Sequence, residues 1–411
     1  MIPSKQNNPF LNIKNKRIRS PPLEENKKKI SQILKLKQTP VFITDKKILL
    51  NRLIKLKQTL NKHWPSNIIA YSFKTNYDIA RNKLFLNQKI WAETVSQKEY
   101  DLALKLKYTN IILNGPYKTT KLLKKAIKNN SLIHIDNSAE INKIIALSKK
   151  AHSHPRGEKN NINIGIRLNT ENSRFGFSIK NNNALDAIKL LKQQKNIKVT
   201  SLHTHLGTDI TNPKRYKKAI IKIIKFINKI EKIKVNIKYI DIGGGFPAHG
   251  NPPYNHNQKK YHLYPIQKYI QPITQQLKRK YTNRKNKPFL ILEPGRFLVD
   301  DSTLLISKVI NTKITSKRQH ITVNTTNSML PLVWYRPQIV KIFDNKLKAK
   351  NTNTLSTSIY GASCQENDLL YQGQLPQTNQ NDYAVFFCTG AYNQSMASNF
   401  IFNKAKTFFI N

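Results

Sequence analysis

The sequence predicts an α/β protein in which a (β/α)8 barrel is joined to a second, β-rich domain of sandwich-like or barrel-like form. Between residues 46 and 297, short apolar runs with strand character alternate with amphipathic stretches of helical spacing. About seven or eight such units over roughly 250 residues suit a closed parallel barrel better than an open sheet. After residue 297 the helical spacing fades, and strands with polar turns continue to residue 411.

The expected barrel strands recur along this region of the chain. They cover residues 67–73, 110–114, 131–136, 161–168, 199–205, 238–242 and 289–293. An earlier run, residues 39–45, has the same strand character and is expected to join the second domain. We therefore predict a flexible basic arm (1–30), a strand segment contributed to the β-domain (31–45), the barrel (46–297) and the C-terminal β-domain (298–411).

The composition is that of a globular protein with an unusual charge. Lys and Arg total 71 and Asp and Glu total 22 in 411 residues, which gives a formal net charge of +49. The basic residues are mainly Lys and are spread along the whole chain together with many Asn and Ile. A nucleic-acid site would concentrate charge on one face and favour Arg, so we do not expect nucleic acid as the main partner.

The two cysteines, Cys364 and Cys388, exclude a disulfide framework and a Cys-rich zinc site. Residues 1–28 lack the apolar run of a signal peptide, and no later stretch is long and apolar enough for a transmembrane helix. We therefore expect a cytoplasmic protein without a membrane partner.

In a parallel barrel the C-terminal ends of the strands face the active site. Lys74 follows the first expected strand directly, where a desolvated amine loses its proton more easily and can form a Schiff base. His203 and His205 end another strand without the carboxylate or Cys that would complete a zinc site. The tight Gly207-Thr208 turn after them favours an imidazole that lies flat on an aromatic cofactor.

Two further strand ends carry groups suited to an anionic, nitrogen-containing ring. Gly243, Gly244 and Gly245 allow the backbone to approach an anion and offer it N–H groups, and they lack the spacings of nucleotide-binding loops. Glu293 and Arg296 share one tight turn. A carboxylate there can hold a pyridine nitrogen protonated, and a guanidinium can bind phosphate.

Taken in order, these motifs resemble the fold-type III pyridoxal-phosphate (PLP) decarboxylases, the family of ornithine, arginine and diaminopimelate decarboxylases. The resemblance extends over nearly the whole chain. Its matching segments are Thr39-Pro40 with Asp45, 71–76, 92–96, 114–116, 173–176, 203–207, 243–245, 293–296, 361–368, 390–392 and 395–399.

The resemblance implies that PLP is the cofactor and that no metal is needed. It implies that Lys74 forms the Schiff base, that His205 stacks on the ring and that Glu293 pairs with the ring nitrogen. Cys364 would come from the partner subunit of a homodimer with shared active sites, and would protonate the carbanion left by CO2. The phosphate would be held by Gly243, Gly244, Gly245, Arg296, Thr208 and Tyr392.

The chain departs from the family pattern where the substrate's far end would bind. Members that act on diamino acids place an acidic residue directly after the Cys, but here Gln365 follows and Glu366 comes one position later. Diaminopimelate decarboxylases also carry an Arg before a Pro in the segment that corresponds to residues 328–335, and this chain has none there. The candidate substrate-binding residues are Gln365, Glu366, Trp334 and Tyr335.

A diamino acid whose distal amine is capped tolerates Gln365, because no buried cation is left unpaired. We therefore expect a citryl-diamino acid of siderophore biosynthesis as the amino-acid substrate. The alternatives are diaminopimelate of lysine biosynthesis and free ornithine, lysine or arginine. A non-catalytic homologue is expected to lose Lys74, Glu293 or Cys364, which are all present, and a racemase tends to place a cation where this chain has Glu293.

Overall fold

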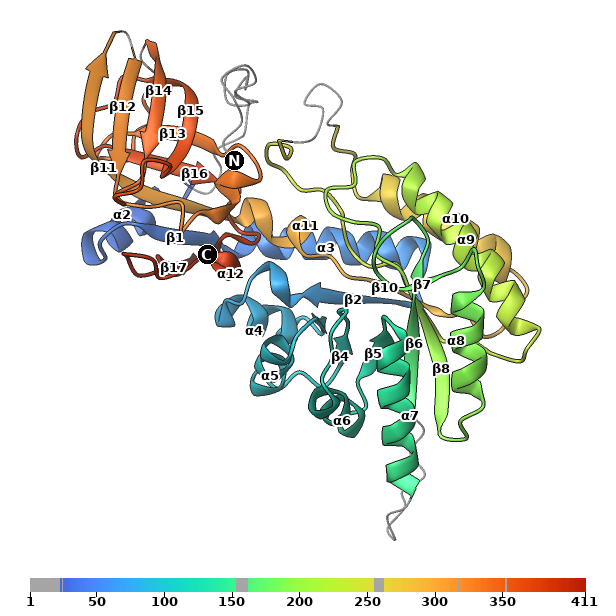
Figure 1. Cartoon of the computed structure of the whole chain (residues 1–411). Coiled ribbons are helices and arrows are strands. Elements are labelled where there is room, and N and C mark those ends of the chain that lie inside the picture. Colours follow the sequence, from blue (N-terminus) through green and yellow to red (C-terminus); the bar gives the residue numbers. More distant parts are fainter. Residues whose placement is uncertain (1–22, 24, 153–161, 255–261, 317, 352) are drawn as a thin grey trace. The chain divides into compact units, whose positions relative to one another are not determined.

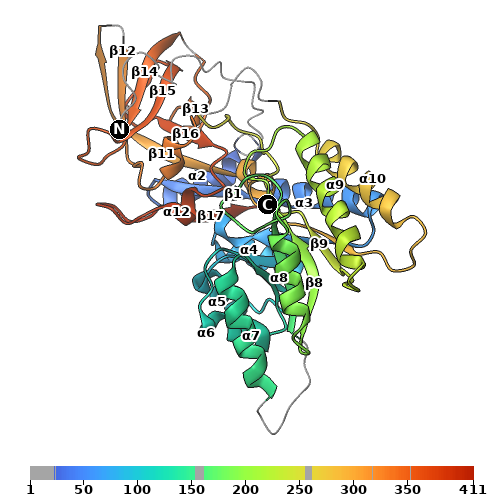
Figure 2. The ribbon, with the colours of Figure 1, turned by 45° about the vertical axis from the view of Figure 1, so that its right-hand side comes forward.

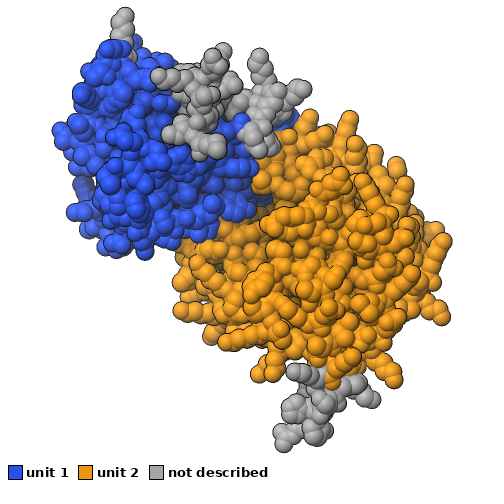
Figure 3. Space-filling model, viewed as in Figure 1, with its two compact units in different colours: residues 1–53, 248–263, 296–411 blue, residues 54–247, 264–295 orange. Residues whose placement is uncertain are grey.

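The computed structural model describes residues 23, 25–152, 162–254, 262–316, 318–351 and 353–411 of the chain (Figure 1). The chain divides into two compact units (Figure 3). Unit 1 comprises Met1–Leu53, Ala248–Leu263 and Arg296–Asn411, and unit 2 comprises Ile54–Pro247 and Tyr264–Gly295. Each unit has its own sheet.

Unit 2 is a closed parallel barrel, as the sequence predicts. Each strand pairs in parallel with the next, and β10 pairs with β2 while β5 pairs with β6, so the ring has no open edge within these strands. A short strand, β7 (Phe177–Ser178), pairs in parallel with the end of β6. The barrel strands in spatial order are β2 (Asn67–Ser72), β3 (Trp91–Thr94), β4 (Ile111–Leu113), β5 (Leu132–Ile135), β6 (Ile162–Asn169), β8 (Ile197–His203), β9 (Tyr239–Asp241) and β10 (Phe289–Leu292).

Amphipathic helices follow the strands and cover the outside of the barrel, as α7 and α8 show in Figures 1 and 2. In α9 the buried residues include Tyr216, Ile220, Ile223 and Ile227, at the three- and four-residue spacing of one helix face. The helices of this layer are α4 (Ile79–Asn87), α5 (Gln97–Lys105), α6 (Thr120–Lys128), α7 (Ser138–His152), α8 (Asn183–Lys192), α9 (Lys214–Glu231) and α10 (Gln267–Tyr281).

Several of these helices begin at a side-chain cap. Asp78, Ser96 and Thr119 accept a hydrogen bond from a backbone N–H in the first turn of α4, α5 and α6 respectively. Such caps satisfy donors that the helix itself leaves unpaired. Because each cap comes soon after a strand end, the connecting loops are short and keep the strand ends in fixed positions.

Unit 1 is built on a second sheet, which confirms the predicted β-rich domain. Its strands run in the order β13-β16-β11-β12-β14-β15, and β1 pairs antiparallel with β11 and parallel with β17. The strands are β1 (Val41–Asp45), β11 (Thr303–Thr315), β12 (Arg318–Val323), β13 (Ile339–Phe343), β14 (Thr354–Tyr360), β15 (Leu369–Pro376), β16 (Tyr383–Phe387) and β17 (Lys406–Ile410). The remaining elements named below are α2 (Lys27–Leu36), α3 (Lys46–His63), α11 (Arg296–Val299), α12 (Asn393–Met396) and the 3-10 turns η1 (Phe73–Thr75) and η4 (Pro331–Trp334).

The predicted flexible arm ends earlier than residue 30. Leu23 and Ile30 are fully buried and pack in the core of unit 1 with Phe343 and Ile410, and α2 begins at Lys27. The segment expected to be a strand therefore starts as a helix, and only β1 is extended. The reason is that Ile30 and the apolar residues one turn later lie on one face of the helix. Burial of this face stabilises the helix although most of its other side chains are basic or polar. The rest of the expected arm, residues 1–22 and 24, lies outside the described residues.

The unit boundaries also differ from a single barrel segment over residues 46–297. The first turns of α3 and the segment Ala248–Leu263 belong to unit 1, and the C-terminal part of unit 1 begins at Arg296. In the part of the chain that the structure describes, no helix has the length and apolar character that a membrane span requires.

Candidate active site

Lys74 lies in η1, directly after β2, at the C-terminal end of the barrel strands. Its ammonium is 2.6 Å from Oε2 of Glu93 and 2.9 Å from the hydroxyl of Ser72. Ser72 also donates to Glu93, so the three groups form one cluster. Glu93 is only 1% exposed, and a carboxylate buried to this extent requires a partner. The ion pair with Glu93 therefore holds the Lys74 amine at the barrel mouth.

A second buried carboxylate, Glu293, lies at the end of β10. Asn114, which follows β4, donates from Nδ2 to Glu293 over 2.6 Å and to Glu93 over 3.0 Å. The carboxylate at the end of β10 and the carboxylate that pairs with Lys74 are thus connected through a single amide.

Two histidines form the next layer of the barrel interior. The rings of His134 and His203 stack at a centroid separation of 4.8 Å with an interplanar angle of 9°. Gly165 of β6 makes this packing possible, because a Cβ at that position would collide with the His134 ring. Burial is the main cause that lowers the pKa of both histidines well below the usual value of 6.5, so both rings are neutral.

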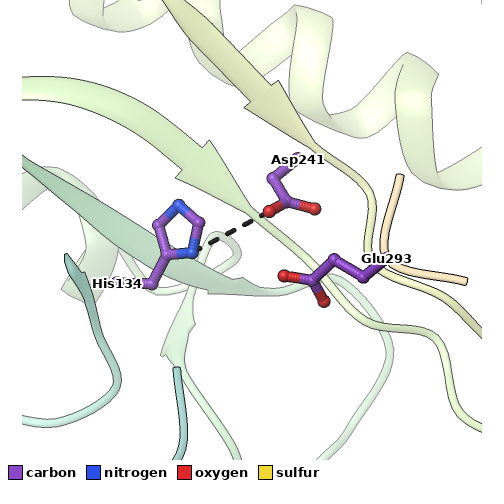
Figure 4. Close-up of side chains that lie close together, drawn as sticks. All are labelled: His134, Asp241 and Glu293. Carbon is purple, nitrogen blue, oxygen red and sulfur yellow. Dashed lines mark ion pairs between the residues drawn. The ribbon is translucent and has the colours of Figure 1, made fainter. Parts of the chain in front are cut away.

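His134, Asp241 and Glu293 converge on one point inside the barrel (Figure 4). Such a set could bind a metal ion, but both His134 ring nitrogens already have partners. Nδ1 is 2.7 Å from Oδ1 of Asn114, and Nε2 is 2.8 Å from the Ser201 hydroxyl. A metal would have to break one of these bonds, so the hydrogen-bonded cluster is the better description.

Asp241 and Glu293 are two carboxyl groups in one buried pocket. Burial first, and then the neighbouring Glu293, raise the pKa of Asp241 well above its ordinary value. Burial therefore favours the protonated form of Asp241. The backbone N–H of Gly243 donates to Asp241 over 2.8 Å and fixes the start of the glycine run.

His205 and the three glycines form a cradle in which side chains have no room. A Cβ at Gly243 would lie 2.7 Å from Nδ1 of His205, and one at Gly244 would collide with the carbonyl oxygen of Glu293. Gly243 and Gly245 also have positive φ values of 68° and 86°, which glycine adopts without strain. Burial, followed by the charge of Lys74, lowers the pKa of His205 to about 4.

A cavity of about 140 Å³ opens beside His205 at the ends of β6 and β8. Its wall includes Arg167, which pairs with Asp136 over 3.0 Å and stacks on Phe175 at 4.5 Å. Thr208 follows in an exposed position. The predicted residues Lys74, His205, Gly243–Gly245 and Glu293 all belong to unit 2 and lie at its strand ends.

Arg296 and Tyr392, the other predicted phosphate ligands, belong to unit 1. The Arg296 guanidinium lies 5.0 Å from the centre of the Tyr392 ring, and its Nη1 is 3.2 Å from Asp300. Tyr392 has a φ of 67°, the left-handed conformation, at the start of α12. Arg296 and Tyr392, which are both predicted to bind the phosphate, thus lie close together in unit 1.

Cys364 is exposed in a loop that Asp368 organises within unit 1. The buried Asp368 carboxylate accepts from the backbone and hydroxyl of Ser363 and, over 2.7 Å, from the backbone N–H of Asn327. This carboxylate ties the loop 361–368 to the segment that leads into η4. Gln365 and Glu366 are exposed beside Cys364, Trp334 is 55% exposed, and Tyr335 is half-buried.

The sequence motifs do not indicate Glu93, Asn114, His134 and Asp241 as site residues. Each lies within one residue of the C-terminal end of a barrel strand, so a rule that takes every polar residue at such positions would have found them. His134 lies inside an apolar run and resembles a core residue, which explains why it is overlooked.

The family model described as the pyridoxal-binding domain of the pyridoxal-dependent decarboxylases matches residues 50–300. The chain belongs to this family. Diaminopimelate decarboxylase of Methanocaldococcus jannaschii is 26% identical over 386 residues, which cover 88% of this chain and 84% of that protein. Diaminopimelate decarboxylase of Buchnera aphidicola subsp. Schizaphis graminum is 28% identical over 400 residues, covering 91% and 89% respectively.

Solved structures share both parts of the fold. Helicobacter pylori diaminopimelate decarboxylase complexed with L-lysine aligns with a TM-score of 0.80 over 93% of this chain and 94% of that chain, at 19% identity. Vibrio vulnificus lysine/ornithine decarboxylase complexed with putrescine aligns with a TM-score of 0.77 over 94% and 98%, at 18% identity. The decarboxylase fold, a barrel with a second domain made mostly of sheet, is therefore confirmed.

The family confirms the predicted cofactor, PLP, and the predicted activity, decarboxylation of an amino acid. The residues present fit this cofactor. The glycine run lets an anion approach the backbone where a Cβ would fill the space, and Glu293 is a buried carboxylate suited to a protonated ring nitrogen. Lys74 supplies the amine at the same barrel end.

The neutral histidines predict an acid-sensitive barrel. Below pH 6.5 the unfolded chain binds protons that His134 and His203 cannot accept when folded, so stability is fully present above this pH and is lost as the pH falls. His203→Leu should reduce the slope of unfolding free energy against pH by about 1.4 kcal/mol per unit between about pH 6 and pH 5. Urea unfolding at a series of pH values measures it. His320→Leu, a change in β12, is the control, and an unchanged slope for His203→Leu would contradict the assignment.

Proposed function

We propose that the protein decarboxylates meso-diaminopimelate, the alternative that the sequence analysis placed second. The observation that carries this proposal is that the M. jannaschii and Buchnera relatives, aligned over most of their own length, are diaminopimelate decarboxylases. They favour this substrate over a citryl-diamino acid.

In this proposal each residue of unit 2 has a distinct task toward PLP. Lys74 holds the cofactor covalently, with Glu93 keeping the amine in place. Glu293 holds the proton at the ring nitrogen, His205 lies against the ring, and the glycine run Gly243–Gly245 lets the phosphate approach the backbone closely. When bound, the cofactor accepts the electron pair that CO2 leaves on the α-carbon.

The family resemblance gives residues of unit 1 further roles toward the cofactor and the substrate. Arg296 and Tyr392 add a cation and a hydroxyl for the phosphate, which their proximity to each other supports. Cys364 delivers a proton to the α-carbon after CO2 has left. Trp334, Tyr335, Gln365 and Glu366 meet the far end of the substrate, and the exposed position of the loop around Cys364 supports this role.

The covalent assignment predicts where the cofactor is trapped. Borohydride reduction of the PLP-loaded protein should fix the cofactor to Lys74, because this amine is held by Glu93 at the strand end. Peptide mass spectrometry reads the position of the adduct. Lys118→Arg, a change at a buried lysine paired with Glu140, is the control and should leave the adduct in place. An adduct on any other lysine of the native protein would refute the role of Lys74.

A second candidate substrate, a diamino acid whose distal amine is capped, rests on the far end of the site. Gln365 offers no charge to a distal ammonium. Arg336 does not replace the arginine missing before Pro331, because its guanidinium is buried 3.8 Å from Asp300. Glu366, exposed next to Gln365, is the carboxylate that would favour the free diamino acid instead.

The two substrates separate in a direct competition. We expect higher kcat/KM for meso-diaminopimelate than for citrate-capped ornithine or diaminopropionate, and Glu366→Gln should lower it about ten- to a hundredfold through the loss of a charge-assisted contact. Steady-state CO2 release measures both values. Glu25→Gln, a change at an exposed position outside the loop, is the control. Preference for the capped compounds would establish the citryl-diamino acid reading instead.

We also propose that the protein is a homodimer whose subunits share active sites. The support is that unit 1 exposes large apolar side chains at Trp334, Met396 and Phe400–Phe402, all between 39% and 58% exposed. η4 and α12 carry two of these residues and are joined by a hydrogen bond from the Leu332 N–H to Asn393. A surface of this kind commonly marks a protein interface.

Shared sites predict complementation between inactive chains. A mixture of Lys74→Ala and Cys364→Ala chains should regain up to about a quarter of native activity, because random pairing makes half the dimers mixed and leaves one intact site in each. Activity after co-refolding measures this, and a mixture of Lys74→Ala with Lys74→Ala/Cys364→Ala chains is the control without recovery. No recovery despite demonstrated subunit exchange would show that both residues serve a site within one chain.

A further inference from the structure

Asn114 occupies a position between two carboxylates that the proposed function uses for different tasks. Its Nδ2 lies 3.0 Å from Oε1 of Glu93 and 2.6 Å from Oε1 of Glu293, and all three side chains are at least 96% buried. An amide nitrogen carries two hydrogens, so each carboxylate receives one. Asn114 is therefore the donor that Glu93 and Glu293 have in common.

The orientation of this amide is fixed from the other side. Oδ1 of Asn114 lies 2.7 Å from Nδ1 of His134, whose Nε2 lies 2.8 Å from the Ser201 hydroxyl. A neutral imidazole donates from one nitrogen and accepts at the other, so Nδ1 donates to Asn114 and Nε2 accepts from Ser201. The opposite orientation of the amide would place its carbonyl oxygen against two carboxylates.

Resting on the proposed function, we propose that Asn114 is a positioning residue. Its amide, oriented by His134, sets the distance between Glu93 and Glu293. Because Glu93 holds Lys74 and Glu293 holds the cofactor ring, this distance places the lysine relative to the ring. Neither Asn114 nor His134 touches the reacting atoms in this scheme. They act through the two carboxylates.

The physical need for such a residue follows from the charges. Two carboxylates close together in a buried pocket repel each other, and a hydrogen-bond donor that contacts both offsets this repulsion. Glu93 also has Lys74 and Ser72 as donors, whereas Glu293 lies 3.5 Å from Nε2 of His203, which is beyond a normal hydrogen-bond distance. Asn114, at 2.6 Å, and the neighbouring carboxyl group of Asp241 are therefore the groups that act most directly on Glu293.

The test replaces the donor with an acceptor of the same size. Asn114→Asp should weaken PLP binding about ten- to a hundredfold and shift the pH midpoint of the bound cofactor's visible absorbance upward by about one unit or more. Titration of the apoprotein with PLP and absorbance at a series of pH values measure both. The matched control is Asn82→Asp, an equally buried asparagine of the barrel unit on α4, which should leave the midpoint unchanged. Equal shifts in both variants would refute the positioning role.

A second pair of variants tests the orienting role of His134 without changing Asn114. His134→Leu removes the donor to Oδ1 and should shift the midpoint in the same direction by a smaller amount, while His134→Gln retains an N–H donor and should restore most of the native value. Native behaviour in Asn114→Asp and in His134→Leu would overturn the inference. Failure of the proposed function would give a different result. The native protein would then bind PLP but would not release CO2 from meso-diaminopimelate.

Discussion

Burial of carboxylates at the mouth of the barrel is the constraint on which the site depends. Glu93, Asp241 and Glu293 are each at most 3% exposed. A buried carboxylate must be paired, hydrogen-bonded or protonated, and here each of the three adopts a different solution. Glu93 pairs with Lys74, Glu293 accepts from Asn114, and burial raises the pKa of Asp241, which favours its protonated form. Distinct chemical roles follow from one shared environment.

Close packing around the histidines turns that constraint into a precise geometry. His134 fits only because Gly165 lacks a side chain, and its ring is held flat on His203. The glycines after β9 have the same effect beside His205, where a Cβ would displace His205 or the backbone of Glu293. Rigid strands and small residues at selected positions therefore define where polar groups can approach a flat, charged ligand.

The large positive charge does not arise from the site. Many of the acidic residues are buried, each at a particular place in one of the two units, while the lysines are mostly on the surface. The buried acidic residues include Asp45, Glu93, Glu99, Asp136, Glu140, Asp209, Asp241, Glu293, Asp300, Asp368 and Asp382. Few carboxylates are left to balance the surface lysines, so the net charge describes the surface and gives little information about the chemistry.

The sequence by itself determined the parallel barrel, the second sheet and those site residues that their type and their position at a strand end identify. Lys74, His205, the glycine run and Glu293 belong to this group, because reactive groups after apolar strands must lie at the same barrel face. The sequence did not reveal α2, whose Ile30 is buried only because unit 1 offers a core for it. Nor did it reveal that Asn114 joins Glu93 to Glu293, or that His134 orients Asn114. These contacts connect residues up to 179 positions apart, and only closure of the barrel brings β4, β5 and β10 close enough for one amide to serve two carboxylates.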